Sequence, residues 1–541
     1  MNNHLFQGFC LSALVVGSFG CQTAQEEESQ RPNVIYIMTD DHAYQALSCY
    51  DSDLIETPNL DRIAEEGMRF VQSFVTNSIS APSRATLLTG QYSHKNGVID
   101  NMKTFDGSQL TFPKLLQEAG YQTAMIGKWH LKSAPTGFDY WKVLPGQGDY
   151  YNPDFIEMGE QVRDTGYVTD IITDDVIQWI ENTDKAKPFC VLYHHKAPHR
   201  AWWPGPDHLN TFDETTFPEP ATLFDDYKNR QAAEAALMEI DSHMYLSSDL
   251  KVKPELIKNK GMYPDINHPG RFQTYQNKLG RMTDEQREAW EKAYADRNRE
   301  FQEMDTRSKD FVRWKYQQYM EDYLRCIASV DDNVGRLLDY LEDNGLKENT
   351  IVVYTSDQGF YLGEHGWFDK RFMYRESLRM PLLVQYPKEV EAGSVNEDIV
   401  LNLDFAPTFL DYAGIDKPDQ MQGRSLRPVL KGKTPGDWRE DMYYHYYEYP
   451  SWHGVKRHYG IRSDRYKLMH FYYDIDAWEF YDLKKDSLEI HNEIDNPKYQ
   501  DEIERLKARM EALRDRYGDS DSLARQYIEQ WIENGYTESG F

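Results

Sequence analysis

The sequence contains few cysteines. Of its 541 residues only five are cysteines, and Cys49, Cys190 and Cys326 are the three that lie beyond the first 21 residues. An odd and scattered set of this kind cannot form a disulfide framework, and it lacks the spacing of a zinc site. We therefore expect these cysteines to be small, buried, apolar side chains.

Positive charge is also scarce. The formal net charge is −29, and no block of Lys and Arg occurs anywhere in the chain. Because a nucleic-acid partner requires a basic face, the composition excludes one. An anionic substrate is still compatible with this charge, provided that Lys, Arg and a metal ion converge in one pocket. Most of the carboxylates can simply lie on the solvated surface and have no role in binding.

Long apolar runs are missing as well. The run at residues 11–19 is too short to span a bilayer as a helix, and it ends in Gly20-Cys21. We interpret residues 1–21 as a signal peptide of the lipoprotein type and the polar residues 22–31 as a linker. The leader has no Lys or Arg, so a plainly secreted protein is the alternative. Either way we expect an exported protein, periplasmic or outer-membrane-anchored in a Gram-negative bacterium, with membrane contact only through a lipid anchor.

From residue 32 onward, apolar runs of strand length alternate with helical segments. The runs lie at residues 33–38, 123–126, 189–193, 351–355 and 382–386. Nearly continuous apolar character is typical of strands buried on both faces of a mostly parallel sheet. Apolar residues at helical spacing between 324 and 341 predict a helix that ends at Asn344-Gly345. The sequence thus predicts an α/β fold with a large, mostly parallel sheet flanked by helices.

Two segments differ from this pattern. Residues 204–310 are charged and poor in Val and Ile, and contain a capping-box sequence at 283–286. We interpret them as an insertion in a catalytic domain that spans residues 32–423. Residues 460–471 and 478–483 alternate like antiparallel strands and precede a charged helix at 501–516. They predict a C-terminal α+β domain over residues 424–541.

Polar residues follow four of the five apolar runs. Asp40 and Asp41 follow the first run, and Asp357 and Gln358 follow the run at 351–355. In open α/β sheets ligands bind at the carboxyl ends of the strands, so these residues should converge. Oxygen donors without His or Cys suit a hard divalent cation, Ca²⁺ or Mg²⁺. Either pair alone could be a helix cap or a turn; together they favour one metal ion.

Residues 80–90 read S-A-P-S-R-A-T-L-L-T-G. Pro82 near the start and Gly90 near the end predict a short helix with Ser80 just ahead of it. The N–H groups at such a helix start favour an anion. Taken alone, Ser80 is either a plain helix cap or a nucleophile, and the residues around it leave both readings open.

The same run closely resembles the signature of the formylglycine-dependent type I sulfatases, which belong to the alkaline-phosphatase-like superfamily. In that signature a Cys or Ser, any residue, Pro, any residue and Arg direct oxidation of the first residue to formylglycine (3-oxoalanine). Ser80, Pro82 and Arg84 match every fixed position. The resemblance runs from about residue 32 to 496. Its further matches are Gly127-Lys128-Trp129-His130, Ala197-Pro198-His199, Thr355-Ser356-Asp357-Gln358-Gly359, Gly363-Glu364-His365-Gly366 and Lys370.

The resemblance implies a metal site and a set of partners. Its ligands would be Asp40, Asp41, Asp357, Gln358 and modified Ser80, with Ca²⁺ favoured over Mg²⁺. The position of Gln358 is often Asn or His in relatives, but Gln still offers a carbonyl oxygen. A separate maturation enzyme would oxidise Ser80, and the Ser form of the motif is associated with the anaerobic bacterial route.

The resemblance also implies catalytic roles. The hydrated aldehyde at position 80, supported by Arg84, would attack sulfur. Lys128 and Lys370 would hold the charge of the sulfuryl group. His199, or Lys370, would protonate the departing alkoxide, and His130 would take the proton whose loss expels sulfate. Supporting roles remain for His94, His194 and His195, of which His195 could exchange roles with His199.

Residues 367–384 resemble the subgroup of N-acetylglucosamine-6-sulfatases. In that subgroup residues beside the catalytic Lys reach the sugar, which implies that Asp369 and Arg371 bind its free hydroxyls. An aromatic segment at 443–453, followed by His458, is either an ordinary Tyr-rich strand or a cover over the pocket, and we expect His458 to contact substrate. The implied substrate is a sulfated carbohydrate carrying 6-O-sulfate on N-acetylglucosamine or glucosamine, from heparin, heparan-type or related glycans.

Two alternatives to a sulfuric ester hydrolase remain. A phosphatase or phosphodiesterase of the same superfamily would also place a metal at strand ends, but such relatives usually bind two metals through several His ligands. A non-catalytic glycan-binding lipoprotein would keep the pocket and lack the aldehyde.

Overall fold

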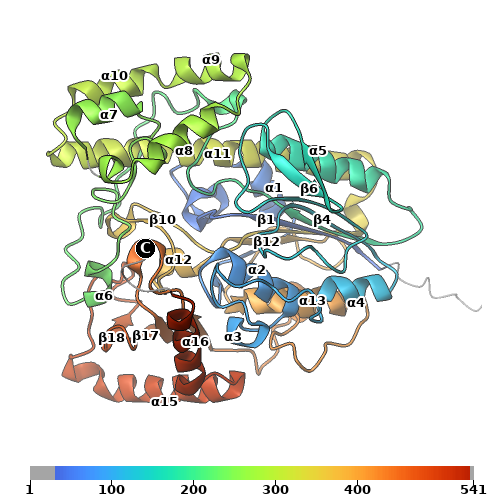
Figure 1. The fold of residues 1–541 in the computed structure, drawn as a ribbon. Helices are drawn as coiled ribbons and strands as arrows, with labels where there is room; N and C mark the ends of the chain where they lie inside the picture. Colours follow the sequence, from blue (N-terminus) through green and yellow to red (C-terminus); the bar gives the residue numbers. More distant parts are fainter. Residues whose placement is uncertain (1–30, 263, 536–541) are drawn as a thin grey trace, which may run out of the picture.

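The computed structural model describes residues 31–262 and 264–535, so the predicted signal peptide lies outside the described residues. A ten-stranded sheet forms the centre of the molecule (Figure 1). Its strands, in spatial order, are β13 (Ser394–Asn396), β2 (Met68–Phe70), β12 (Leu382–Gln385), β9 (Thr350–Ser356), β1 (Asn33–Thr39), β8 (Phe189–His194), β4 (Gln122–Lys128), β5 (Tyr140–Leu144), β6 (Asp154–Glu157) and β7 (Glu160–Arg163).

The middle of this sheet is parallel. β1 pairs in parallel with β9 on one side and β8 on the other, and β4 continues the parallel order to β5. β12 is antiparallel to both of its neighbours, and β6 and β7 form an antiparallel edge. The predicted α/β fold with a large, mostly parallel sheet is confirmed. The direction of β12 could not be predicted, because a strand buried on both faces has the same apolar pattern in either direction.

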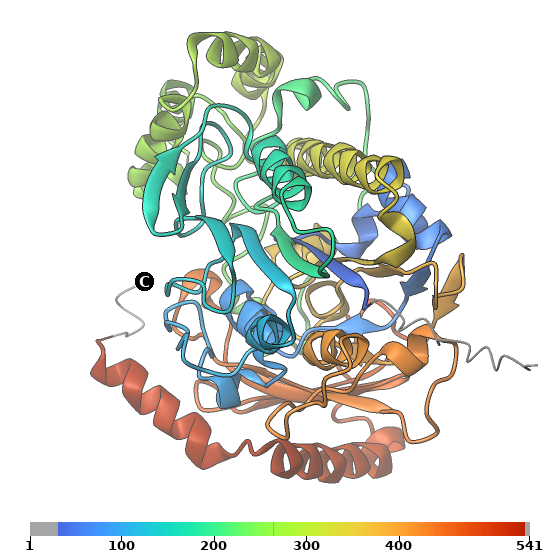
Figure 2. The same ribbon diagram turned by 90° about the vertical axis from the view of Figure 1, so that its right-hand side faces the viewer.

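Helices cover both faces of the sheet (Figures 1 and 2). Ile35 and Ile37 of β1 belong to one hydrophobic core, together with side chains of α1 (Pro58–Glu65), α5 (Val168–Glu181) and α11 (Lys309–Asp343). Val34 and Tyr36 point into the other core, with α2 (Ser80–Thr89), α4 (Phe112–Glu118) and α13 (Phe405–Tyr412). Because alternate residues enter two different cores, the strand is apolar throughout.

The regular elements of the segment predicted to be an insertion are short helices joined by long loops. Figure 1 shows α7, α9 and α10 beyond α11, on the side away from the sheet. The predicted capping box at the start of α9 is confirmed, since the Thr283 side chain accepts a hydrogen bond from the backbone N–H of Gln286. The helices of this segment are α6 (Gln231–Glu234), α7 (Pro254–Lys260), α8 (Gly270–Leu279), α9 (Asp284–Ala293) and α10 (Ala295–Glu303).

A separate four-stranded antiparallel sheet lies in the C-terminal part of the chain. Its strands, in order, are β15 (Asp441–Tyr446), β16 (His458–Ser463), β17 (Tyr466–Phe471) and β18 (Ala477–Asp482). α15 (Gln500–Tyr517) packs its apolar side chains into the same core as this sheet, and α16 (Asp521–Glu533) follows it. The boundary near residue 423 stays a prediction.

Several short elements complete the described chain. The short strands are β3 (Ser73–Phe74), β10 (Tyr361–Leu362), β11 (Phe368–Asp369) and β14 (Val400–Leu401), and the short helices are α3 (Ser93–Asn96), α12 (Arg375–Leu378) and α14 (Arg427–Leu430). Cys190 and Cys326 are buried and Cys49 is half-buried, all three as free thiols. Within the described ranges, every helix is too short or too polar to cross a membrane.

Four parallel strands end at the same edge of the sheet, and this edge positions the candidate site. β1 leads into Asp40, β9 leads into Asp357, β4 ends at Lys128, and β8 leads towards His199. The close approach of β4 to β8 depends on Gly127, which has a φ of 106° and pairs with His194. A Cβ atom at this position would lie 1.9 Å from the carbonyl oxygen of His194.

We therefore predict that Gly127→Ala lowers the free energy of unfolding by about 3 kcal/mol, because the added methyl group meets backbone that cannot move cheaply. Gly97→Ala is the matched control, since Gly97 also has a positive φ but would have nothing within 4 Å of its Cβ. The free energy of unfolding of Gly97→Ala should fall by only about 1 kcal/mol. Urea denaturation of both variants measures the difference; equal losses would contradict the steric argument.

Candidate active site

Six buried charged side chains meet at the carboxyl edge of the parallel strands. They are three carboxylates and three cations, so their formal charges cancel, and the most exposed of them has only 4% of its side-chain surface exposed. Buried charges are tolerated only when they are paired in this way. We call the set the ion cluster; its members are Asp40, Asp41, Arg84, Lys128, Asp357 and Lys370.

Each carboxylate of the ion cluster has its own cation. The Arg84 guanidinium donates to Asp357 Oδ2 from Nη2 at 3.0 Å and from Nε at 3.2 Å. The Lys370 ammonium lies 2.6 and 2.7 Å from the two oxygens of Asp41. Lys128 donates to Asp40 Oδ2. The partners come from the ends of three strands (β1, β4 and β9), a helix and a loop, so these pairs join distant parts of the chain.

Ser80 lies against this cluster. The sequence places Ser80 just ahead of a helix, and in the structure it is the first residue of α2. Its Oγ donates to Asp40 Oδ1 at 3.1 Å. Its surface is 1% exposed, yet it lines a cavity of about 450 Å³ that also reaches His199 and Lys370. An oxygen at position 80 is therefore accessible to a ligand while being surrounded by cations and a helix start, which favour an anion.

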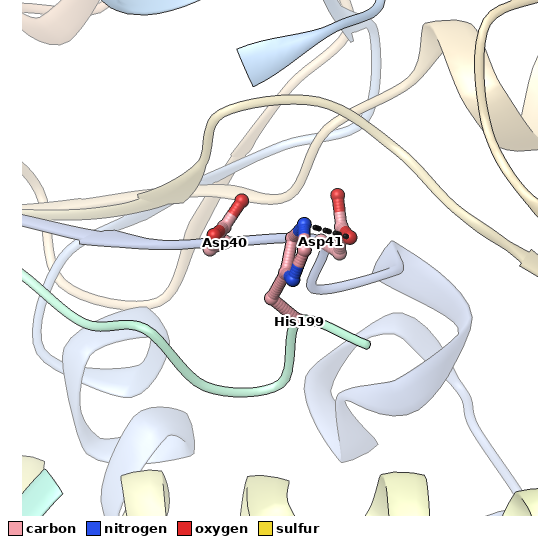
Figure 3. Close-up of side chains that lie close together, drawn as sticks. All are labelled: Asp40, Asp41 and His199. Atoms are coloured by element: carbon pink, nitrogen blue, oxygen red, sulfur yellow. Dashed lines mark ion pairs between the residues drawn. The ribbon is translucent and has the colours of Figure 1, made fainter. Parts of the chain in front are cut away.

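The residues present fit a hard divalent cation. Asp40, Asp41 and His199 each offer a ligand atom within 4.8 Å of the others, and Figure 3 shows His199 facing the two aspartates at the end of β1. Among residues 31–262 and 264–535 the buried side-chain oxygen of Gln358 has no hydrogen-bond partner, while its amide nitrogen donates to Asp41. Burial raises the pKa of the Asp41 carboxyl to about 7, even beside Lys370. A metal ion would act in the opposite direction and hold Asp41 ionised.

Asp357 lies beside this group. One of its oxygens accepts the backbone N–H of Asp41 at 3.1 Å, and the other is bound by Arg84. His199 is a possible ligand that the resemblance does not imply, with its Nε2 3.8 Å from Asp41 Oδ2. Whether Asp357 and Gln358 are metal ligands stays a prediction.

Two histidines and a glutamine surround Lys128. Gln147 accepts from Lys128 Nζ at 2.5 Å through its side-chain oxygen, and its amide lies 3.1 Å from His130 Nε2. Burial, followed by the charge of Lys128, holds the pKa of both His130 and His199 well below the usual value. For His130 this favours a neutral ring that can accept a proton. Gln147 is not among the site residues predicted from the sequence. The same strand-end rule could have found it, since it follows β5.

A polar wall lies beside Lys370 in the cavity. Asp369 and Arg371 flank Lys370 in sequence, but they do not share its partner Asp41. Arg371 donates to Asp369 Oδ1 at 3.1 Å and to Glu448 Oε1 at 2.9 Å. His453 Nε2 lies 3.2 Å from Asp369 Oδ2. All four of these side chains line the cavity, and we call them the polar wall. Their alternating donors and acceptors suit the hydroxyl groups of a sugar.

The backbone is strained where this wall meets the ion cluster. Asp369 and Arg371 have φ values of 83° and 96°, and Asp41 and His130 have φ values of 72° and 57°. Non-glycine residues in this region cost of order 1–3 kcal/mol each, and such residues concentrate at functional sites. The strained backbone lets Lys370 point towards Asp41 while its neighbours Asp369 and Arg371 point towards His453 and Glu448.

His458 is placed elsewhere. Its ring is fully buried in the C-terminal sheet, stacked at 5.5 Å on Tyr444 and 4.9 Å from the centre of Phe471. This position does not support the predicted contact with substrate, because other aromatic rings already cover the imidazole. In the aromatic segment singled out in the sequence, the histidine that lines the cavity is His453.

The remaining histidines lie outside the cavity lining. His194 Nδ1 is 3.2 Å from the carbonyl oxygen of Lys128 and 3.4 Å from Arg84 Nη1, so it supports the cluster. His195 packs against Tyr193 with ring centres 4.4 Å apart, while His199 reaches the cavity. His94 bonds the backbone of Tyr517 and lies away from the ion cluster.

Comparison with known protein families gives two matches. Residues 32–415 match the family described as sulfatase, and residues 363–516 match the C-terminal region of N-sulphoglucosamine sulphohydrolase. The first match covers the whole ion cluster. Sulfatases normally bind one divalent metal ion, so a divalent-cation site is part of the fold.

Individual relatives agree with this assignment. The chain is 54% identical, over 94% of its length and 91% of the relative, to an N-acetylglucosamine-6-O-sulfatase of Bacteroides thetaiotaomicron. It is 27% identical to human N-acetylglucosamine-6-sulfatase over 77% of this chain and 68% of that one. A solved structure in complex with its substrate D-glucosamine-2-N,6-O-disulfate superposes with a TM-score of 0.86 at 53% identity, covering 91% of this chain and 99% of that one.

The metal site leads to a prediction about stability. Removing divalent cations with EDTA should lower the melting temperature by on the order of 5 °C, and excess Ca²⁺ should restore it, because a ligand that binds only the folded state stabilises it by mass action. Differential scanning calorimetry at constant ionic strength measures this shift, with NaCl as the control salt. A melting temperature that is the same in EDTA and in Ca²⁺ would exclude a structural metal at the ion cluster.

Proposed function

Because the chain belongs to the sulfatase family, we propose that this sulfuric ester hydrolase removes 6-O-sulfate from glucosamine or N-acetylglucosamine residues of heparin, heparan-type or related glycans. One observation carries the proposal: a single cavity is lined by Ser80, by Lys370 of the ion cluster and by the polar wall. The relative that is 54% identical is an N-acetylglucosamine-6-O-sulfatase, and the substrate in the related complex is a glucosamine disulfate.

Ca²⁺ is the cation that the donor set favours. Asp40, Asp41, Asp357 and Gln358 offer oxygen atoms from the ends of two strands, and the site is buried. Ca²⁺ accepts six to eight such oxygens in flexible geometry, whereas Mg²⁺ keeps several waters and demands a regular octahedron. When bound, the cation supplies Lewis-acid stabilisation of negative charge on oxygen.

The charge balance of the site matches its proposed reaction. The ion cluster is formally neutral, so a divalent cation would leave two positive charges. A sulfate monoester carries one negative charge, and an ionised nucleophile at position 80 carries the second. Loss of two hydrogens from Ser80 gives formylglycine, whose hydrate offers this ionisable oxygen close to Arg84.

Neighbouring residues position the sulfate ester and move protons. Lys370 lines the cavity, and Lys128 lies buried beside it, bound to Asp40 and Gln147. Both cations would stabilise the charge that develops on the sulfuryl oxygens. His199 or Lys370 protonates the departing sugar alkoxide, since both line the cavity beside Ser80. His130 accepts the proton whose removal lets sulfate leave. Its neutral state suits this role as a base.

The polar wall orients the sugar. A carboxylate (Asp369) and a guanidinium (Arg371) side by side bind a hydroxyl that both donates and accepts a hydrogen bond, and His453 extends this wall. Because Asp369 and Arg371 adjoin Lys370 in the chain, residues 369–371 together position the sugar and its sulfate group.

Maturation and export complete the proposal. A separate enzyme of the anaerobic bacterial type converts Ser80 to formylglycine. The signal peptide and Cys21 then direct the protein to the periplasm or the outer membrane of a Gram-negative cell, where a lipid anchor is its only membrane contact. These steps are drawn from the sequence motifs and the leader composition.

The proposal predicts a covalent change at position 80. When the protein is expressed with a suitable maturation enzyme, the peptide that contains Ser80 should lose two hydrogens, and preparations that carry more of the aldehyde should release proportionally more sulfate. Mass spectrometry of the peptide and ion chromatography of sulfate measure the two quantities. Unmodified serine in a preparation that nevertheless releases sulfate at full rate would contradict the proposed nucleophile.

Matched esters provide the control for that experiment. The same preparations should release no comparable amount of phosphate from the equivalent 6-phosphate sugar, because a phosphate monoester adds a second negative charge to the balanced site. Preferential release of phosphate would instead favour a phosphatase, and tight binding of the sugar without any release would favour a glycan-binding protein.

A second prediction concerns the polar wall. Asp369→Ala, Arg371→Ala and His453→Ala should each lower kcat/KM on N-acetylglucosamine-6-sulfate by roughly 100-fold, because each leaves a buried partner unsatisfied. On a small aryl sulfate, which has no sugar hydroxyls to bind, kcat/KM of the same variants should fall by less than about fivefold. Equal losses on both substrates would show that these residues serve the reaction centre or the fold instead.

A further inference from the structure

A second set of cations lines the cavity, and the proposed reaction does not use it. Lys196 follows β8, and Arg271 and Lys278 extend from α8 of the insertion. We call these three residues the cationic wall. None of them is a member of the ion cluster.

α8 turns one face towards the cavity. The cavity is lined by Arg271, Thr274, Tyr275 and Lys278, which recur at the spacing of one helical face. Residues between them in sequence, such as Gln273 and Gln276, are exposed. The insertion therefore contributes a definite surface to the ligand site.

Lys196 is a buried cation without a carboxylate partner in the part of the chain that the structure describes. Its surface is 4% exposed, and its Nζ donates to the backbone oxygen of Gln147 at 2.9 Å. Burial, and then the charge of Lys278, lowers the pKa of Lys196 to about 7. An anion bound beside it would oppose both effects.

Arg271 has unused donors. Its guanidinium lies 5.2 Å from the ring centre of Trp452 and 4.5 Å from that of Tyr245, and among the described residues its side chain has no hydrogen bond or ion pair. Trp452 lines the same cavity and is 58% exposed. Stacking on aromatic rings holds the guanidinium in place and leaves its five N–H groups for a ligand.

Lys278 is only partly neutralised. It pairs with Asp149, but the same carboxylate also pairs with Arg281 at 3.3 Å. Arg281 also pairs with Asp154 at 3.0 Å, so Asp149 is shared rather than reserved for Lys278. With one shared carboxylate against three cations, the cationic wall keeps a net positive charge. Gln147 separates it from the ion cluster, since its side chain bonds Lys128 while its backbone bonds Lys196.

We propose that the cationic wall binds a second anionic group of the saccharide, distinct from the sulfate ester that is cleaved. The inference rests on the proposed function for the identity of the sugar. The chemistry required is a sulfate-like or carboxylate anion that accepts charge-assisted hydrogen bonds from Lys and Arg. Two sources fit: a sulfamate on the nitrogen of the same glucosamine, or the carboxylate of an adjoining uronic acid.

Binding to protein that cannot turn over tests the wall. In a Ser80→Ala background, titration calorimetry compares glucosamine-2-N,6-O-disulfate, N-acetylglucosamine-6-sulfate and a disaccharide that joins a uronic acid to the latter. Arg271→Gln and Lys278→Gln should each weaken binding of a ligand with the second anion by roughly tenfold, and of N-acetylglucosamine-6-sulfate by less than about twofold.

Arg287→Gln is the matched control. Arg287 belongs to the same insertion and is 46% exposed, and its ion pair is with Glu291 of its own helix. The substitution removes the same charge outside the cavity, so it should change none of the three affinities. This control separates a local contact from the general loss of positive charge.

The three ligands also identify the source of the anion. A loss confined to the disulfate assigns the wall to the sulfamate, and a loss confined to the disaccharide assigns it to the uronate. If the substitutions weaken binding of none of the ligands, or weaken binding of all three equally, the proposal that the cationic wall binds a second anion is overturned. If the matured protein releases sulfate from none of these saccharides, the proposed function fails, while the binding comparison still decides the wall.

Discussion

Charge compensation inside a buried cluster is the constraint on which the rest of this structure depends. Three carboxylates and three cations lie out of contact with water at the carboxyl edge of the sheet. Leaving one of them unpaired would cost roughly 3–5 kcal/mol. Because Asp40 follows β1, Arg84 lies in α2, Lys128 ends β4, and Asp357 follows β9, the strands and the helix must be fixed in relation to one another before the charges cancel. The fold therefore determines where a metal ion, a nucleophile and an anion can meet.

The segment around Lys370 connects this cluster to recognition of the ligand. Lys370 is bound to Asp41, and its strained neighbours Asp369 and Arg371 face Glu448 and His453 from the C-terminal part of the chain. A shift of this segment would displace Lys370 and the polar wall together. The helix α8 adds a third surface. The cavity is thus assembled from the strand ends of the sheet, from α8 and from the C-terminal segment, each contributing different chemistry.

The sequence predicts part of this arrangement, and physical reasons limit the rest. Apolar runs locate the central strands, and the strand-end rule anticipates that Asp40, Asp41, Asp357 and Lys128 lie close together, although their roles stay predictions. Partners that join through tertiary contact leave no local signal: Glu448 and the helix face of α8 are examples. The choice of His458 over His453 shows the limit within one segment. Both follow a Tyr-rich stretch, and only packing decides that the first is covered by rings and the second faces the cavity.

The central claim is that an oxygen at position 80, beside the ion cluster, attacks the sulfur atom of a sulfate ester. Hydrolysis of N-acetylglucosamine-6-sulfate in ¹⁸O-labelled water tests it most directly, because the position of the label reports which bond breaks. The account predicts that the label appears in the released sulfate and that the sugar hydroxyl keeps its original oxygen. Label in the 6-hydroxyl of the sugar would mean cleavage between carbon and oxygen, and would contradict attack on sulfur from position 80.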